Sequence, residues 1–172
     1  TANMDELTGL LNRRAGKADL EEKLRSASRE RVPVTVCLSD LNNLKVINDT
    51  YGHKEGDYAL VSVAHIVNEY LYPEDTVFRL SGDEFIIAFY GCSLENATRK
   101  IQIILNAMER KAAEERLAYQ LSFSYGLVEA QPCDECSVME LISQADEIMY
   151  EQKQQYHIEQ ARRRLACSPE EE

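Results

Sequence analysis

Two adjacent acidic residues, Asp83 and Glu84, stand between two short runs of mostly apolar residues. The runs 76–80 and 85–90 predict two strands, and the few residues between them predict a hairpin. Ser81 and Gly82 begin this turn, and a glycine lets the backbone approach a ligand closely. Two carboxylates at one hairpin tip repel each other unless solvent surrounds them or a cation lies between them. The pair therefore indicates either a solvated turn or a Mg²⁺ site that also binds substrate phosphates.

The composition is typical of one globular domain. The chain has 172 residues, of which 44% are hydrophobic and 28% are charged, so it is long enough to close a core. Its net charge of −11 argues against a nucleic-acid duplex or an anionic membrane as partner. A nucleotide stays compatible with this charge, because a metal ion and a few lysines can invert the local field. No apolar run approaches the ~20 residues of a membrane span.

The cysteines favour a reducing compartment. Five cysteines at irregular spacing do not form a disulfide framework, which makes the cytoplasm the expected location. Cys133 and Cys136 form a single CxxC, but no second pair or nearby histidine completes a zinc site. We interpret this CxxC as a feature of the loop 131–137.

A second candidate acidic residue follows a buried strand. Residues 34–38 are apolar on both faces of the segment, which predicts a strand covered on both sides. Asp40 comes directly after it, and a carboxylate at the carboxyl end of such a strand is a common ligand contact. Asp40 or Asn42 could instead cap the helix that follows.

The segment 41–57 is rich in Gly, Asn and Asp around a short helical piece. Asn48 and Asp57 offer an amide and a carboxylate, and a carboxylate pairs well with the N1–H and N2 amine of guanine. The same residue types also form ordinary turns, and this alternative stays open on the segment alone.

Periodic apolar residues predict the remaining elements. Helices are expected over 14–29, 58–70, 94–112 and 138–153, with a further strand at 121–128 and a last stretch, 160–172, that extends a helix and frays.

Four motifs together resemble the GGDEF family, the diguanylate cyclases. In chain order they span Asp5 to Arg13, 40 to 60, Ser81 to Phe85 and Ala145 to Lys153. The resemblance implies an α+β fold with a central, mostly antiparallel five-stranded sheet flanked by helices, like that of nucleotide cyclases and polymerase palm domains. It implies a domain over residues 1–160 and a frayed or disordered tail over 161–172.

The resemblance also implies a reaction and its partners. Two GTP-loaded domains would meet face to face, and each 3′-hydroxyl would attack the α-phosphate of the other GTP to give cyclic di-GMP and two pyrophosphates. Catalysis would then need a homodimer, which is expected to be weak or absent for this domain alone. An upstream sensory or regulatory domain would control dimerisation. The domain is expected in the cytoplasm, alone or as the cytoplasmic part of a larger protein.

Site residues follow from the same resemblance, motif by motif. Asp40 and Glu84 would bind Mg²⁺ or Mn²⁺, with Asp83 alongside and the Leu41 carbonyl helping. Either Asp83 or Glu84 would assist deprotonation of the 3′-hydroxyl. The remaining contacts to the substrate are divided between phosphate neutralisation (Lys45, Lys153), guanine recognition (Asn48, Asp57) and the close backbone of the signature turn (Ser81, Gly82).

This sequence departs from the family pattern at several positions. Ser81 replaces the first signature glycine, Asn42 replaces an aspartate, Leu44 replaces an aromatic residue, and Tyr156-His157-Ile158 stands where Gly-Arg-Asn is usual. The product-inhibition motif would fall at 72–75, where its arginine is absent, so no such site is expected. The departures keep an alternative open, in which a weak or inactive domain binds GTP and regulates an attached or partner domain.

Overall fold

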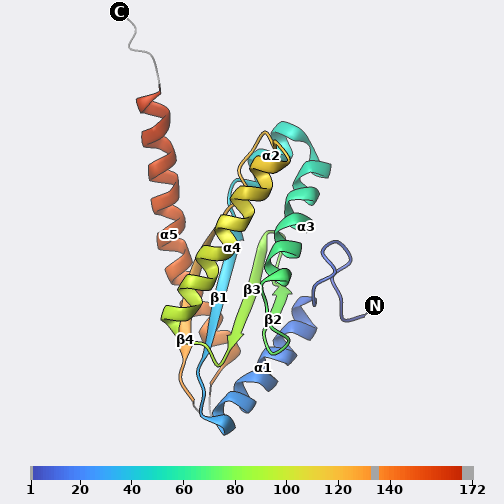
Figure 1. Ribbon diagram of the computed structural model, residues 1–172, viewed down its shortest axis with the longest axis vertical. Helices are drawn as coiled ribbons and strands as arrows, with labels where there is room; N and C mark the ends of the chain where they lie inside the picture. The colour runs from blue at the N-terminus through green and yellow to red at the C-terminus, as the bar shows by residue number, and fades with distance from the viewer. Residues whose placement is uncertain (1, 133–135, 168–172) are drawn as a thin grey trace, which may run out of the picture.

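The chain folds into one antiparallel sheet with helices on both faces (Figure 1). The computed structural model describes residues 2–132 and 136–167. The helices are α1 (Arg13–Glu30), α2 (Leu44–Tyr51), α3 (His53–Glu69), α4 (Leu94–Glu114) and α5 (Val138–Ala166). The strands are β1 (Val34–Leu41), β2 (Thr76–Arg79), β3 (Glu84–Tyr90) and β4 (Phe123–Ala130).

The strands lie in the order β2-β3-β1-β4, and each neighbouring pair is antiparallel. β1 is buried along its whole length, and β2 and β3 form the predicted hairpin. The described residues form four strands, whereas the family resemblance predicted five. Residues 154–166 contain no glycine or proline, so α5 continues past Lys153 and these residues do not form a strand.

Alternate residues along the strands pack on opposite faces of the sheet. Val36, Leu38 and Ile86 join the core formed with α1 and α5. The alternate residues Cys37, Phe85 and Ile87 join the core formed with α3 and α4. Asp40 and Glu84 continue the first series, two positions beyond Leu38 and two before Ile86. The two acids therefore point to the face of the sheet that α1 and α5 cover.

α5 lies very close to the sheet at Gly126 of β4. A Cβ atom built on Gly126 would lie 2.0 Å from the carbonyl oxygen of Ala145, so only glycine permits this approach. Beyond this contact α5 projects past the sheet, and most of its residues after position 150 are exposed (Figure 1). Residues 161–166 belong to this helix, and 168–172 lie outside the described residues.

Local sequence signals explain the helix starts. The Asn12 side chain accepts a hydrogen bond from the Ala15 N–H (2.9 Å), so Asn12 is the N-cap of α1. α3 begins at His53, five residues before the predicted start, because Gly52 adopts φ +95° and separates it sharply from α2.

The structure does not give a membrane-crossing segment within residues 2–132 and 136–167, since no helix there is both long and apolar enough. Cys133 of the CxxC lies outside the described residues, whereas Cys136 is half-buried.

Candidate active site

Asp40 lies at the end of the central strand, between the two neighbouring strands. It stands opposite Glu84 of β3 on one side and opposite Ser124 of β4 on the other. Directly opposed residues of antiparallel strands point to the same face, so the sheet itself brings Asp40 and Glu84 together. Only 8% of the Asp40 surface is exposed, which makes it an unusually buried acid.

The two oxygens of Asp40 have different surroundings. Oδ2 accepts a hydrogen bond from Nζ of Lys153 on α5 at 2.6 Å, which is also an ion pair. Oδ1 is buried and has no hydrogen-bond partner. Burial raises the pKa of Asp40 to about 6, the hydrogen bond from Lys153 opposes this rise, and the nearby Asp83 adds to it. A buried carboxylate oxygen without a donor is a position that a cation can occupy.

The hairpin tip holds the remaining acids beside Asp40. The Leu41 N–H donates to the Asp83 carbonyl oxygen (3.0 Å), which joins the end of β1 to the tip. The Ser81 hydroxyl donates a hydrogen bond to Oε1 of Glu84. The substituted signature residue therefore contacts the carboxylate that the family resemblance assigns to the metal.

The residues present fit a divalent cation, although the site is open. Asp40, Asp83 and Glu84 with the Leu41 carbonyl offer the hard oxygen ligands that Mg²⁺ prefers. Within the described part of the chain, no three Asp, Glu, His or Cys side chains are already arranged around one point. The Lys153 ammonium takes one Asp40 oxygen and the Ser81 hydroxyl takes one Glu84 oxygen. Cation binding would therefore use Asp40 Oδ1 first.

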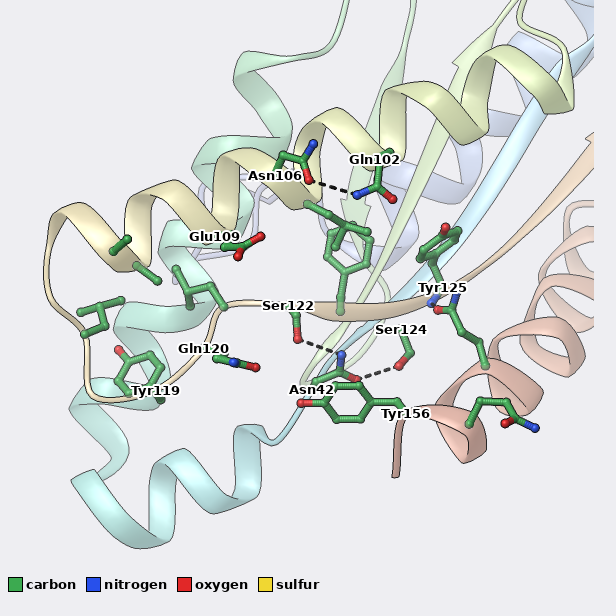
Figure 2. Close-up of a pocket in the computed structure, with 18 of the residues that line it drawn as sticks. Asn42, Gln102, Asn106, Glu109, Tyr119, Gln120, Ser122, Ser124, Tyr125 and Tyr156 are labelled. Atoms are coloured by element: carbon green, nitrogen blue, oxygen red, sulfur yellow. Dashed lines mark hydrogen bonds between the residues drawn. The ribbon is translucent and has the colours of Figure 1, made fainter. Parts of the chain in front are cut away.

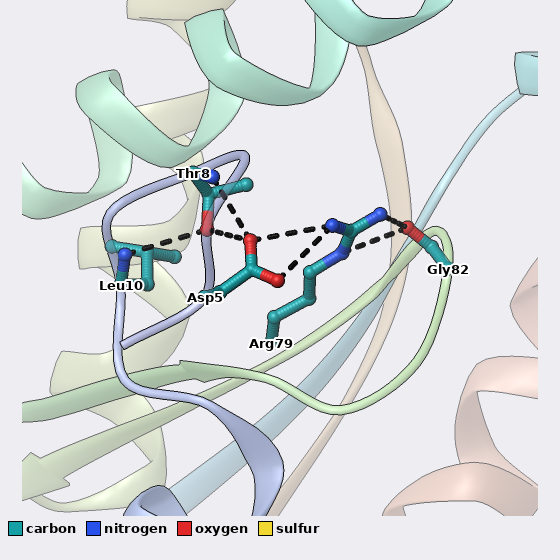
Figure 3. A network of polar contacts seen from close by, with 5 residues as sticks. All are labelled: Asp5, Thr8, Leu10, Arg79 and Gly82. Carbon is teal, nitrogen blue, oxygen red and sulfur yellow. Dashed lines mark hydrogen bonds and ion pairs between the residues drawn. The ribbon is translucent and has the colours of Figure 1, made fainter. Parts of the chain in front are cut away.

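The tip is fixed from the other side by Arg79, the last residue of β2 (Figure 3). Its guanidinium donates to the Gly82 carbonyl oxygen through Nε (3.1 Å) and Nη2 (2.7 Å), and through Nη1 to both oxygens of Asp5 (3.3 and 3.2 Å). Thr8 donates to the same Asp5 carboxylate from its N–H and its hydroxyl. Burial alone would raise the pKa of Asp5, but the Thr8 hydrogen bonds and the Arg79 charge bring it below its usual value.

The sequence analysis did not find this connection between the first motif and the third. Asp5 and Arg79 are far apart in the chain, and nothing in either motif indicates the pairing. The available signal was an arginine placed just before the acidic turn, which is a natural partner for an acid of another motif.

The predicted guanine-binding pair lies where α2 and α3 meet. A Cβ atom built on Gly56 of α3 would lie 1.7 Å from Oδ1 of Asn48, so the Asn48 amide packs directly on the Gly56 backbone. Asp57 follows Gly56 and is exposed. The assignment of Asn48 and Asp57 to guanine stays a prediction. Lys45 lies on the first turn of α2 with its side chain exposed.

A cavity of about 900 Å³ lies between α4, β4 and α5 (Figure 2). Asn42 and Tyr156 are part of its wall, but none of the predicted site residues lines it. The predicted nucleotide site is an open face at the end of the sheet, distinct from this cavity.

The family model for the GGDEF domain of diguanylate cyclases matches residues 2–158. The chain belongs to the GGDEF family. This GGDEF domain is 34% identical over 152 residues to the diguanylate cyclase DgcS of Shewanella oneidensis, which covers 88% of this chain and 50% of that protein. It is 33% identical over 154 residues to DgcZ of Escherichia coli, which covers 89% and 51%. The chain spans about half the length of these relatives.

Solved GGDEF domains confirm the fold. A microbial GGDEF domain that interacts with cyclic di-GMP has a TM-score of 0.76 and 33% identity, over 89% of this chain and 94% of that chain. The GGDEF domain of DgcB from Caulobacter crescentus, solved in complex with c-di-GMP, has a TM-score of 0.81 and 25% identity, over 90% and 89%. The predicted family and the antiparallel α+β fold are both confirmed.

Proposed function

We propose that this GGDEF domain condenses two GTP molecules into cyclic di-GMP and two pyrophosphates, between two copies of the domain. The observation that carries the proposal is the buried Asp40, which has one oxygen without a partner and lies opposite Glu84 and beside Asp83. Burial destabilises the ionised form of an acid, so a purely structural role does not explain why an acid is buried here. The names of the relatives support the same reaction.

Each group in the site then has a chemical task. Mg²⁺ or Mn²⁺ held by Asp40, Glu84, Asp83 and the Leu41 carbonyl would neutralise phosphate charge and favour ionisation of the 3′-hydroxyl. Asp83 or Glu84 would accept the proton of that hydroxyl. Lys45 and Lys153 would balance the charge of the β- and γ-phosphates, for which Lys153 must share its ammonium between Asp40 and the nucleotide.

Base recognition falls to α2 and α3. The Asp57 carboxylate would accept hydrogen bonds from guanine N1–H and N2, and the Asn48 amide would hydrogen-bond to the rest of the base edge. Adenine presents neither donor at these positions, so the pair would favour GTP over ATP. Asp57→Ala should reduce this preference, measured as the ratio of the two dissociation constants.

The reaction requires two copies, because one open face binds one GTP and the attacking hydroxyl comes from the other. The experiment joins the domain to a parallel dimeric coiled coil at its N-terminus and incubates it with GTP and Mg²⁺. Cyclic di-GMP should form in the dimer and at a much lower rate in the free domain. Glu84→Gln should abolish synthesis and leave the unfolding midpoint nearly unchanged, because this half-exposed residue at the start of β3 contributes little to the core. Absence of GTP binding would overturn the proposal.

A second candidate function rests on the contact between Ser81 and Glu84. A hydroxyl that donates to Glu84 Oε1 competes with a cation for this carboxylate. The domain would then bind GTP without turning it over and act as a regulator of an attached or partner domain. GTP binding without product in the wild type, together with product formation by Ser81→Gly, would establish this second function.

A further inference from the structure

The turn between β1 and α2 connects the predicted metal ligands to the predicted phosphate ligand. Asp40 and Leu41 end the strand, Asn42 and Asn43 form the turn, and Lys45 lies in the first turn of the helix. A change in this turn therefore changes where the Lys45 ammonium lies relative to Asp40.

Asn43 adopts a left-handed backbone conformation, with φ 61° and ψ 24°. This region is strained for most residues, although asparagine tolerates it better than most. Asn43 occupies the N-cap position of α2, but its side chain makes no capping hydrogen bond. Its amide instead donates to the hydroxyl of Tyr156 on α5 at 2.9 Å.

The first turn residue, Asn42, is held from β4. Its amide nitrogen donates to the Ser122 hydroxyl (2.9 Å), and its carbonyl oxygen accepts from the Ser124 hydroxyl (2.7 Å). Figure 2 shows both hydrogen bonds, with the ring of Tyr156 beside Asn42. β4 thus fixes Asn42, and α5 fixes Asn43.

Three residues on one side of α5 contact the end of the sheet. Gln152 accepts from the Tyr125 N–H (2.6 Å), Lys153 binds Asp40, and Tyr156 binds Asn43. Gln152 and Lys153 precede Tyr156 by four and three residues, so both are its neighbours on the helix surface. The Tyr156 contact lies in the stretch where this chain departs from the Gly-Arg-Asn that is usual in the family.

We propose that Tyr156 is a positioning residue for the GTP site. It holds the Asn43 turn so that Lys45 faces the phosphates beside the cation that Asp40 would hold. The inference rests on the proposed function, because it assigns Lys45 to the phosphates. The tyrosine hydroxyl is the part that acts. Its ring also packs edge-on against His157, and a phenylalanine retains this packing.

The test compares Tyr156→Phe with Tyr150→Phe in the full chain. Tyr150 is a control on the same helix, because it is 62% exposed and its hydroxyl makes no hydrogen bond within the described part of the chain. The probe is 3′-deoxy-GTP with Mg²⁺, which lacks the attacking hydroxyl and so reports binding without turnover. Tyr156→Phe should weaken binding about 3- to 10-fold, the effect of losing one neutral hydrogen bond, and Tyr150→Phe should leave it unchanged.

A double-mutant cycle separates positioning from packing. Asn43→Gly removes the amide and still permits the left-handed backbone. If the hydrogen bond carries the effect, Tyr156→Phe should cause no further loss of affinity in the Asn43→Gly background. An equal loss in both backgrounds, or no loss in either, would overturn the inference.

Hydrogen exchange of the ligand-free chain gives a readout that does not depend on GTP. Tyr156→Phe should speed amide exchange at residues 43–45, and Tyr150→Phe should not. A wild type that fails to bind GTP, but shows this local change, would overturn the proposed function and the Lys45 assignment while confirming the contact. A wild type that binds GTP, with no change in affinity or exchange on Tyr156→Phe, would overturn the inference alone.

Discussion

Lys153 and Asp40 form a partly buried ion pair, with 2.6 Å between Nζ and Oδ2, at the point where α5 meets the end of β1. The pair satisfies one oxygen of the acid and leaves the other, Oδ1, without a partner. One carboxylate is therefore shared between a structural contact to a helix and a candidate cation site. The packing of α5 and the chemistry of the site depend on the same residue.

The Asp40–Lys153 ion pair should make the effect of Lys153→Met depend on pH. At pH 8 Asp40 is ionised and needs the ammonium, whereas at pH 5 most of it is protonated, because burial raises its pKa to about 6. We expect the free energy of unfolding to fall by roughly 2–3 kcal/mol at pH 8 and by less at pH 5. Denaturant unfolding at both pH values measures the difference.

The raised pKa of Asp40 also determines how the stability of the wild type changes with pH. Folded Asp40 holds its proton more tightly than the unfolded chain does, so its contribution to stability is complete below about pH 4 and is lost as the pH rises through about 6. Lys111→Met breaks the surface pair with Glu115, and its effect on stability should be small and the same at both pH values. An equal cost of Lys153→Met at both pH values would contradict the assignment.

Gly56→Ala should impair nucleotide binding without loss of stability. Alanine is the better helix former by up to about 1 kcal/mol, and Gly56 lies within α3. The new Cβ, however, would overlap the Asn48 amide and force this half-buried side chain to move. We expect an unchanged or higher unfolding midpoint and GTP binding that is weaker by about tenfold.

Lys54→Ala is the matched control, since it changes an exposed residue of the same helix. It should leave GTP binding unchanged. Normal GTP affinity of Gly56→Ala would show that Asn48 does not contact the base.

The sequence predicted the parts of the site that depend on local pattern. Alternation predicted the hairpin and the buried strand. The position of Asp40 opposite Glu84 became visible only in the pairing of β1 with β3. The count of five strands, which came from the family resemblance, was wrong, since the described residues form four. The contact of Lys153 with Asp40 was not foreseen as a direct bond, although both residues were assigned to one site.

Long-range polar contacts could not be predicted in the same way. Asp5 and Arg79 are 74 positions apart, and Asn43 and Tyr156 are 113 apart. Such pairs form only after the hairpin, the first loop and α5 have packed, and neither residue carries a periodic signal for its partner. Asn42 was considered as a helix cap, but its amide binds the hydroxyls of Ser122, just before β4, and of Ser124 in β4.

Arg79→Met should loosen the acidic turn. The arginine makes hydrogen bonds to Gly82 and an ion pair with Asp5, and its side chain is 19% exposed. We expect a loss of roughly 1–3 kcal/mol in the free energy of unfolding and faster amide exchange at residues 81–84. Arg79→Lys keeps the charge but not the planar fork, so its effect should be intermediate.

Arg25→Met is the control for losing an arginine of an exposed ion pair. Arg25 and Glu22 are 60% and 58% exposed, so solvent screens the pair and its loss should have little effect on stability. If Arg25→Met and Arg79→Met had the same effect on exchange at the turn, Arg79 would not be the group that holds it.

Gly126→Ala should displace α5 and, with it, Lys153. The added Cβ would lie 2.0 Å from the Ala145 carbonyl oxygen and 2.7 Å from the Met149 nitrogen, and both atoms belong to the backbone of α5. No side-chain rotation relieves this overlap, so the helix must move, at a cost of roughly 3 kcal/mol in the free energy of unfolding. The movement should also lengthen the Lys153–Asp40 contact, so the pH dependence of stability should approach that of Lys153→Met.

Gly82→Ala is the control for stability, because its Cβ would have no atom within 4 Å and should change the free energy of unfolding by less than ~0.5 kcal/mol. A Gly126→Ala protein as stable as the Gly82→Ala protein would show that α5 is not held in place by its contact with β4.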